Sequence, residues 1–287
     1  VHFTFFFLFL IFCTMHLIII EGNISSGKTT LAKQLETELG YSVFLEPTIT
    51  NPYLVKYYAE PRKYGLKMQL WLLRQRFRAY LAALSHIAET GQGVILDRSI
   101  YSDWVFAEKN RRDGNISEEG FAYYSSLRSQ MLAALPLPSL ALYLDVPASL
   151  CHSRVHNLRK RECESTIPLE YLEGLAVCYE RCNEELSKVG VPLVDLDWSE
   201  FGESTTVGAQ VKSVVAAGRE TGARGIVTDE VKQLLDDSER LHSLSLLPHD
   251  VYSTWYDEEI DEGLHSNLPY AEFEAEEKAR GQKEIAG

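Results

Sequence analysis

The residues of this chain best suited to bind phosphate stand between Gly22 and Thr29, which read GNISSGKT. The stretch fits the pattern G-x-x-x-x-G-K-S/T, in which backbone N–H groups of a loop and the dipole of the following helix attract an anion. We expect Lys28 to reach the β- and γ-phosphates of a nucleoside triphosphate and the hydroxyl of Thr29 to bind Mg²⁺. The residues predicted to hold the triphosphate are Gly22, Asn23, Ile24, Ser25, Ser26, Gly27, Lys28, Thr29 and Thr30.

Charged side chains also follow two short apolar runs that are typical of buried strands. Glu46 follows residues 41–45, and Asp97 and Arg98 follow residues 94–96. Because ligands of open α/β sheets bind at the carboxyl ends of the strands, all three charged residues lie near the phosphate loop if these strands are neighbours. Asp97 then supplies a carboxylate beside Mg²⁺, and Arg98 supplies a guanidinium for a phosphate. Glu46 is a candidate general base for a substrate hydroxyl, or else a solvent-exposed loop acid.

The elements that must position these residues alternate between strands and helices. Apolar, β-branched runs predict five strands, at residues 16–20, 41–45, 94–96, 140–145 and 191–196. Helical patterns follow the phosphate loop as far as Gly40 and span Pro61–Thr90, where Gly91 breaks the second helix. This alternation predicts an α/β protein with the three-layer fold of the P-loop NTPases, in which helices cover both faces of a five-stranded parallel sheet.

Composition and charge limit the class of protein. The 287 residues are 45% hydrophobic, enough for one sizeable α/β domain with an attached segment. The net charge of −13 argues against a general nucleic-acid binder. Most of this charge lies from Gly202 onward, where 18 acidic and 8 basic residues give −10, so the preceding part is nearly balanced. Five cysteines without a C-x-x-C pair indicate free thiols in a reducing compartment and no structural zinc.

Two end segments flank the predicted α/β domain, which we place at residues 15–201. Residues 1–14 are mostly apolar but too short for a membrane-spanning helix, and without basic residues they lack the character of a signal or transit peptide. We interpret Met15 as the natural start, with a hydrophobic anchor as the alternative. Residues 202–287 form an acidic extension, with a helix expected over residues 228–241. We expect this extension to be partly helical or disordered, although its aromatic residues among acids also suit a basic partner surface.

Together these motifs resemble the P-loop deoxynucleoside kinases, the family of the deoxycytidine, deoxyguanosine and deoxyadenosine kinases. The resemblance covers about residues 15–201 and rests on the phosphate loop, on Glu46-Pro47 and on the D-R-S motif at residues 97–99. It implies that the γ-phosphate of ATP is transferred, with Mg²⁺ present, to the 5′-hydroxyl of a deoxynucleoside. It also implies that Glu46 is the catalytic base and that Arg98 contacts the reacting groups.

The resemblance further assigns residues to a nucleoside pocket. Tyr58 and Glu164 are expected to contact the sugar 3′-hydroxyl, and Gln69 to make a bidentate contact to the base. In the family, residues at the positions of Arg76 and Asp103 face each other over the base, and this pair goes with purine deoxynucleosides or deoxycytidine. Because a charged pair fills the space that the thymine methyl group needs, we expect thymidine to be rejected. A plain surface ion pair is the alternative for these two residues.

A lid and a donor loop complete what the resemblance implies. Arg159 and Arg161 match an arginine-rich lid, which stabilises the charge on the transferred phosphoryl group together with Lys28 and Arg98. Residues 195–201 resemble the loop that holds the donor adenine through backbone groups. Outside the phosphate loop, the residues assigned to the donor are Arg154, Glu200 and Phe201.

Two positions depart from the family pattern. The lid is one residue longer than in vertebrate relatives, with Cys163 where an acid is common. Asp97 stands where animal enzymes have glutamate. The bacterial deoxyadenosine and deoxyguanosine kinases have aspartate at this position.

The relatives imply a homodimer. With Met15 as the start, the expected compartment is the cytoplasm, with the mitochondrion as the alternative, and neither nucleic acid nor a membrane is an expected partner.

A kinase-like accessory subunit of mitochondrial complex I is similar as well, and it represents a different class of function. Residues 90–106 and 143–147 resemble that subunit, and by this analogy the role of the present chain would be structural. Against this alternative, the chain keeps the complete set of residues that the kinases use. That set comprises Glu46, Gln69, Arg76, Asp103 and the lid arginines.

Overall fold

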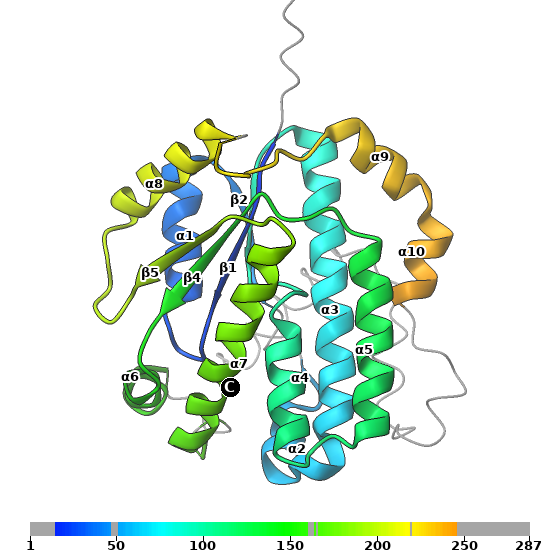
Figure 1. The fold of residues 1–287 in the computed structure, drawn as a ribbon, viewed down its shortest axis with the longest axis vertical. Helices are drawn as coiled ribbons and strands as arrows, with labels where there is room; N and C mark the ends of the chain where they lie inside the picture. The colour runs from blue at the N-terminus through cyan, green and yellow to red at the C-terminus, as the bar shows by residue number, and fades with distance from the viewer. Residues whose placement is uncertain (1–14, 47–50, 160–163, 165, 219, 246–287) are drawn as a thin grey trace, which may run out of the picture.

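Five parallel strands form the centre of the molecule and carry the apolar runs of the sequence (Figure 1). This computed structural model describes residues 15–46, 51–159, 164, 166–218 and 220–245. The strands are β1 (Leu17–Gly22), β2 (Ser42–Phe44), β3 (Val94–Asp97), β4 (Leu140–Asp145) and β5 (Leu193–Asp197). Their order in the sheet is β2-β3-β1-β4-β5. The predicted α/β fold with a five-stranded parallel sheet is confirmed.

The helices include the two that the sequence predicts after the phosphate loop and over residues 61–90. They are α1 (Lys28–Leu39), α2 (Leu54–Ala59), α3 (Pro61–Thr90), α4 (Asp103–Arg112), α5 (Glu118–Ala133), α6 (Ala148–Arg154), a π-helical turn (Val155–Arg159), α7 (Leu169–Lys188), α8 (Ser204–Ala217), α9 (Thr228–Asp236) and α10 (Ser238–Ser245). α3 has the predicted bounds. It begins at a proline, because the first helical position needs no N–H donor. It ends where Gly91 adopts a φ of 68° and donates its N–H to the carbonyl of Ile87.

Helices cover both faces of the sheet. α1 and α8 lie on one side, while α3, α4, α5 and α7 lie on the other (Figure 1). The central strand β1 is covered on both faces, and residues 17–20 have no exposed surface. A strand with both faces buried has a continuous apolar sequence, which explains why this segment shows no alternation of polar and apolar residues.

The register of the sheet brings the predicted site residues to one edge. β1 lies between β3 and β4, with Ile20 opposite Asp97 and Gly22 opposite Leu144. The phosphate loop begins at the end of β1, and Glu46 follows β2, which pairs with β3. The carboxyl ends of these neighbouring strands therefore meet beside the N-terminus of α1.

At the opposite, amino-terminal edge of the sheet, the C-terminal extension crosses the domain. Met15 and Ile226 form an antiparallel bridge, in which the Ile226 N–H donates to the Met15 carbonyl at 2.6 Å and the Met15 N–H donates back at 3.3 Å. Before this crossing α8 packs on α1, and after it α9 and α10 pack on α3. The extension thus links the helices on the two faces of the sheet.

The expectation of a single helix over residues 228–241 is wrong. The structure has two helices there, α9 and α10, which are separated at Asp237. Asp236, Asp237 and Ser238 meet at this point, and such short polar side chains compete with the helix for backbone hydrogen bonds. The Leu241 N–H donates to the Asp237 carbonyl, so a new helix starts at the break.

Three cysteines of the described residues are buried as free thiols. Cys178 and Cys182 lie a turn apart on α7 and are buried in the core, and both are free, as is Cys151. No helix in the described ranges combines the length and the apolar character needed to cross a bilayer. Residues 1–14 and 246–287 lie outside the described ranges, so the interpretations of the leader and of the end of the acidic extension stay predictions.

Candidate active site

The phosphate loop has a backbone shape that favours glycine at two positions. Gly22 has a φ of 146° and Gly27 has a φ of 104°. A Cβ at Gly22 would stand 2.9 Å from the carbonyl oxygen of Leu144, and a Cβ at Gly27 would stand 2.9 Å from the ring of Phe201. The two glycines thus allow the close approach of backbone that a triphosphate cradle requires.

Lys28 lies within this loop, as expected from the motif. Its Nζ donates to the carbonyl oxygen of Asn23 at 2.6 Å and to Oγ of Ser26 at 3.3 Å. Asn23 in turn anchors the loop to α7, because its Nδ2 donates to the Leu172 carbonyl at 2.9 Å. The ammonium therefore stands among loop atoms, where a phosphate held by the loop would meet it. The other predicted loop residues are Ile24, which is buried, Ser25, whose φ is 59°, and Thr30, which is exposed on α1.

Thr29 and Asp97 form a pair of oxygen ligands suited to a divalent cation. The Thr29 hydroxyl donates to Oδ2 of Asp97, while Oδ1 of Asp97 has no hydrogen-bond partner in the described part of the chain. Burial raises the pKa of Asp97, and the nearby Lys28 ammonium opposes this rise. A buried carboxylate oxygen without a partner, beside a hydroxyl, fits Mg²⁺, which prefers oxygen ligands.

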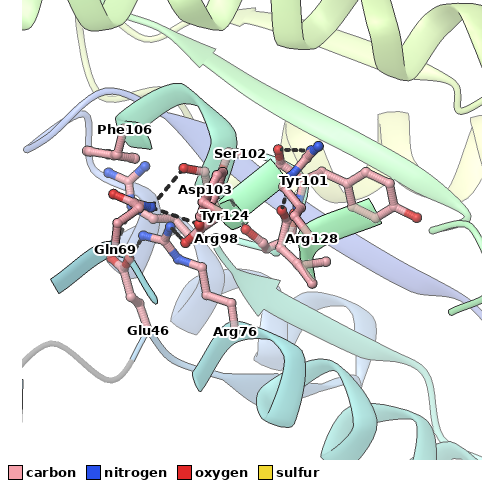
Figure 2. A network of polar contacts seen from close by, with 12 residues as sticks. Glu46, Gln69, Arg76, Arg98, Tyr101, Ser102, Asp103, Phe106, Tyr124 and Arg128 are labelled. Carbon is pink, nitrogen blue, oxygen red and sulfur yellow. Dashed lines mark hydrogen bonds and ion pairs between the residues drawn. The ribbon is translucent and has the colours of Figure 1, made fainter. Parts of the chain in front are cut away.

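Glu46 stands between two buried guanidinium groups. Its Oε2 accepts from Nε of Arg98 at 3.0 Å, and its Oε1 accepts from Arg76 (Figure 2). The side chain is only 14% exposed, so the alternative of a solvent-exposed loop acid does not hold. Burial raises the pKa of Glu46, but the charges of Arg98 and Arg76 outweigh this effect and bring the pKa to about 2. The carboxylate is therefore ionised at neutral pH and is able to accept a proton.

Arg76 connects two residues that the sequence assigned to different tasks. One of its terminal nitrogens donates to Glu46 and the other to Oδ1 of Asp103. Arg76 is 4% exposed and Asp103 is fully buried, which excludes a plain surface ion pair. Gln69 completes the cluster, since its Nε2 donates to Oδ2 of Asp103 at 2.7 Å. These polar residues of α3 are thus buried against α4.

Arg98 adopts a left-handed backbone conformation directly after β3, with a φ of 67°. Its backbone N–H donates to the Ile20 carbonyl at 3.0 Å. Its guanidinium donates to the hydroxyl of Tyr179 on α7 and lies 4.8 Å from the ring centroid of Phe106 on α4. This backbone conformation is uncommon for a residue with a Cβ, and such conformations cluster at functional sites. Here it accompanies a guanidinium held beside the Glu46 carboxylate.

Three aromatic residues of this cluster were not predicted from the sequence. Phe106 and Tyr179 contact the guanidinium of Arg98, and the hydroxyl of Tyr124 on α5 donates to Oδ2 of Asp103 at 2.7 Å. Each residue lies on a helix where an aromatic side chain is ordinary core packing. The only available signal was the polar tip of each tyrosine, which needs a partner when buried.

The residues predicted to bind the sugar lie between α2 and the start of α7. Tyr58 lines a cavity of about 360 Å³ together with Ile167 and Tyr171. Glu164 is buried, and its carbonyl accepts from the Ile167 N–H at 3.1 Å. The segment that carries Glu164 therefore reaches the cavity that Tyr58 lines.

Arg154 ties the segment after β5 to the phosphate loop. Its guanidinium donates to the carbonyls of Ser199 at 2.7 Å and Trp198 at 3.0 Å, and to that of Ser26 at 3.3 Å. The same guanidinium lies 4.4 Å from the ring centroid of Phe201, which is 57% exposed. An exposed aromatic ring beside the phosphate loop is suited to stack against a nucleotide base.

The structure describes the remaining residues predicted for the adenine loop and the lid only in part. Residues 195–197 belong to β5, so only residues 198–201 of the predicted adenine loop are outside regular structure, and Glu200 among them is exposed. Arg161 lies outside the described residues. The backbone of Arg159 ends the π-helical turn, and its side chain is outside the described part.

Comparisons with known proteins agree with this geometry. The family model for deoxynucleoside kinases matches residues 18–217. The chain is 53% identical to a deoxyguanosine kinase of Dictyostelium discoideum over 191 residues, which is 67% of each chain. A solved structure of deoxyadenosine kinase from M. mycoides with bound dCTP superposes with a TM-score of 0.60, at 25% identity, and the match covers 70% of this chain and 99% of that one.

A phosphate loop that faces a buried carboxylate and two guanidinium groups defines an enzyme that transfers a phosphoryl group. The chain belongs to the deoxynucleoside kinase family, whose model matches well over half of it. Subunit 10 of the NADH dehydrogenase (ubiquinone) 1 alpha subcomplex of Bos taurus mitochondria is also similar, at 32% identity over 57% of this chain and 54% of that protein. This weaker match leaves the kinase as the better interpretation, as the sequence motifs indicate.

Proposed function

We propose that this protein transfers the γ-phosphate of ATP to the 5′-hydroxyl of a purine deoxynucleoside, with deoxyguanosine preferred, and that it rejects thymidine. The observation that carries the proposal is the buried series of contacts from Asp103 through Arg76 to Glu46. It joins the residues that recognise the base to the carboxylate that accepts the proton. The identity to a deoxyguanosine kinase supports this choice of base, and deoxycytidine is the alternative acceptor that a charged pair also suits.

On the donor side, the loop at residues 22–29 holds the phosphates of ATP, and Phe201 stacks against the adenine. Lys28 exchanges its contact with the loop carbonyl for a phosphate oxygen. Thr29 and Asp97 would hold Mg²⁺, which would neutralise negative charge on the phosphates. The unpartnered Oδ1 of Asp97 supports this role, since a buried carboxylate oxygen otherwise lacks compensation.

On the acceptor side, Glu46 accepts the proton of the 5′-hydroxyl as the oxygen attacks the γ-phosphorus in line. Its two guanidinium neighbours keep it ionised and fix its orientation. Arg98 donates to Glu46 at 3.0 Å and follows β3, the neighbour of the strand that leads into the phosphate loop, so it contacts the transferred group while Lys28 contacts it from the loop. The lid arginines Arg159 and Arg161, assigned from the sequence, add further positive charge to stabilise the transferred group.

Base selection depends on Gln69, Arg76 and Asp103, and contact with the sugar 3′-hydroxyl depends on Tyr58 and Glu164. The charged pair is buried, with Arg76 only 4% exposed. A thymine methyl group at that place would separate the pair or leave its hydrogen bonds unmade, which costs more than the methyl contact gains.

The remaining expectations concern organisation rather than chemistry. We expect a cytoplasmic homodimer that binds neither nucleic acid nor membranes, with residues 15–201 as the catalytic unit and residues 202–287 as an acidic extension. Size-exclusion chromatography with light scattering tests the dimer.

The decisive experiment is a panel assay with purified protein and γ-labelled ATP. Each of the four natural deoxynucleosides is supplied in turn, with Mg²⁺ present or chelated. We expect a labelled 5′-monophosphate from deoxyguanosine, less from the other acceptors and none from thymidine. An absence of product from all four acceptors would contradict the kinase and favour a structural role like that of the complex I subunit.

A further inference from the structure

Helix α5 contributes two polar side chains to the turn after β3, and neither belongs to a recognised motif. The Tyr124 hydroxyl donates to Oδ2 of Asp103 at 2.7 Å. One helical turn later, Arg128 donates to the carbonyls of Tyr101 at 2.8 Å and Ile100 at 3.3 Å (Figure 2). α5 therefore binds the backbone carbonyls of Ile100 and Tyr101 in this turn and the side chain of Asp103, the first residue of α4.

The contacts of Asp103 determine how the amide of Gln69 is oriented. Nε2 of Gln69 donates to Oδ2 of Asp103 at 2.7 Å and to its carbonyl oxygen at 3.0 Å. Both partners are acceptors, so the NH₂ end of the amide must face Asp103. Oε1 of Gln69 then has no partner among the described residues, although the side chain is fully buried. Such an oxygen is costly unless a ligand supplies a donor.

The carboxylate of Asp103 is itself fully engaged. Arg76 occupies Oδ1, while Gln69 and Tyr124 share Oδ2. Asp103 therefore influences a bound base through its neighbours rather than by direct contact. The atoms left for the base are Oε1 of Gln69, an acceptor, and Nε of Arg76, a buried donor that also has no partner among the described residues. In this arrangement Gln69 offers the base one acceptor instead of the bidentate contact expected from the sequence.

We propose that Tyr124 is a positioning residue for base recognition, which holds the Asp103 carboxylate so that Gln69 presents Oε1 to a hydrogen-bond donor on the base. The inference rests on the proposed function, because it concerns the same acceptor site. The ligand chemistry is a base edge that carries an N–H donor beside an acceptor, as the N1–H and O6 of guanine do. Burial and the charge of Asp103 raise the pKa of Tyr124 well above its ordinary value, so the hydroxyl keeps its proton and remains a donor.

The chain offers a matched control for an ordinary buried hydroxyl. Tyr80 on α3 is as fully buried as Tyr124, and its hydroxyl donates to the Pro136 carbonyl at 2.8 Å rather than to Asp103. Tyr80→Phe and Tyr124→Phe each remove one buried hydroxyl. Both are expected to lower the melting temperature, and only the second is expected to change base recognition.

The test measures kcat and KM for deoxyguanosine and ATP with full-length protein. We expect Tyr124→Phe to raise the KM for deoxyguanosine about tenfold, with kcat changed less than about threefold and the KM for ATP unchanged. In the Asp103→Asn background, Tyr124→Phe has no further effect, because the residue acts through Asp103.

Three results would overturn the inference: an unchanged KM in Tyr124→Phe, an equal change in Tyr80→Phe, or fully additive losses with Asp103→Asn. If Tyr124→Phe does not fold, calorimetry on the wild type compares deoxyguanosine with N1-methyl-deoxyguanosine, which lacks the donor. Binding at least about tenfold weaker supports the exposed Oε1, and equal binding overturns it. A wild type that neither binds nor phosphorylates any deoxynucleoside overturns the proposed function as well, whereas an active wild type with a normal Tyr124→Phe overturns only the role of Tyr124.

Discussion

The two edges of the sheet differ in what they bury. The carboxyl edge buries charge, with Glu46, Arg76, Arg98 and Asp103 in one connected network. The amino edge is closed by the Met15–Ile226 bridge and has a cavity of about 350 Å³ lined by apolar side chains of the α5–β4 connection and α9, with Arg224 and Glu230 at its border. Buried charge reduces stability unless every group is paired, while buried apolar surface adds to it. Changes at the first edge should therefore alter activity, and changes at the second should alter only stability.

The largest expected effect comes from Glu46→Gln. The amide keeps the shape of the side chain and one acceptor, but it cannot take the proton, so we expect kcat to fall about 10³-fold. Binding of deoxyguanosine, measured by calorimetry without ATP, should change less than about threefold. Substantial turnover by this variant would refute the assignment of the base.

The second largest effect concerns the pH dependence of stability, which we expect to arise at the carboxyl edge through Glu46. The pKa of Glu46 is about 2 in the folded protein, against an ordinary value of 4.5, so folding favours the ionised form. Its contribution, on the order of 3 kcal/mol, is fully present above pH 4.5 and is lost as the pH falls from there toward 2. Urea unfolding between pH 6 and 3 should show a smaller acid loss in Glu46→Gln than in the wild type, and equal losses would contradict the low pKa.

A pair of glycine substitutions tests whether backbone strain at the carboxyl edge of the sheet weakens the binding of ATP. Gly27→Ala places a Cβ at a φ of 104° and within 2.9 Å of the Phe201 ring, and we expect the KM for ATP to rise at least about tenfold. Gly40→Ala has a similarly positive φ of 67° but no atom within 4 Å of the added Cβ. It should cost about 1 kcal/mol of stability and leave the KM for ATP unchanged.

The smallest expected effect lies at the amino edge. Ile226 is 4% exposed, and Ile226→Val removes one buried methylene group, at a cost of about 1 kcal/mol. Thermal unfolding should shift by a few degrees, while kcat and both KM values stay at the wild-type level. A change in kcat would show that the extension communicates with the site.

The sequence was sufficient where local pattern decides structure. The phosphate loop, the buried strands and the bounds of α3 follow from motif, β-branched runs and the Pro61 and Gly91 boundaries. The contact between Arg76 and Glu46 could not be predicted in the same way, because it depends on packing between residues 30 positions apart. Tyr124 was missed for the same reason, since its partner lies 21 positions away on another helix. The break at Asp237 shows the opposite limit, where a weak local preference decided between one helix and two.

In the proposed reaction, the two guanidinium groups around Glu46 also determine when the proton moves. A carboxylate with a pKa of about 2 is a weak base, so it does not draw the proton from a free alcohol. Transfer becomes favourable only after the oxygen has begun to bond to phosphorus, which a loose, metaphosphate-like transition state allows. The solvent deuterium isotope effect on the chemical step should accordingly be close to one. In the proposed reaction the carboxylate orients the hydroxyl from the start and receives its proton while the bond to phosphorus forms.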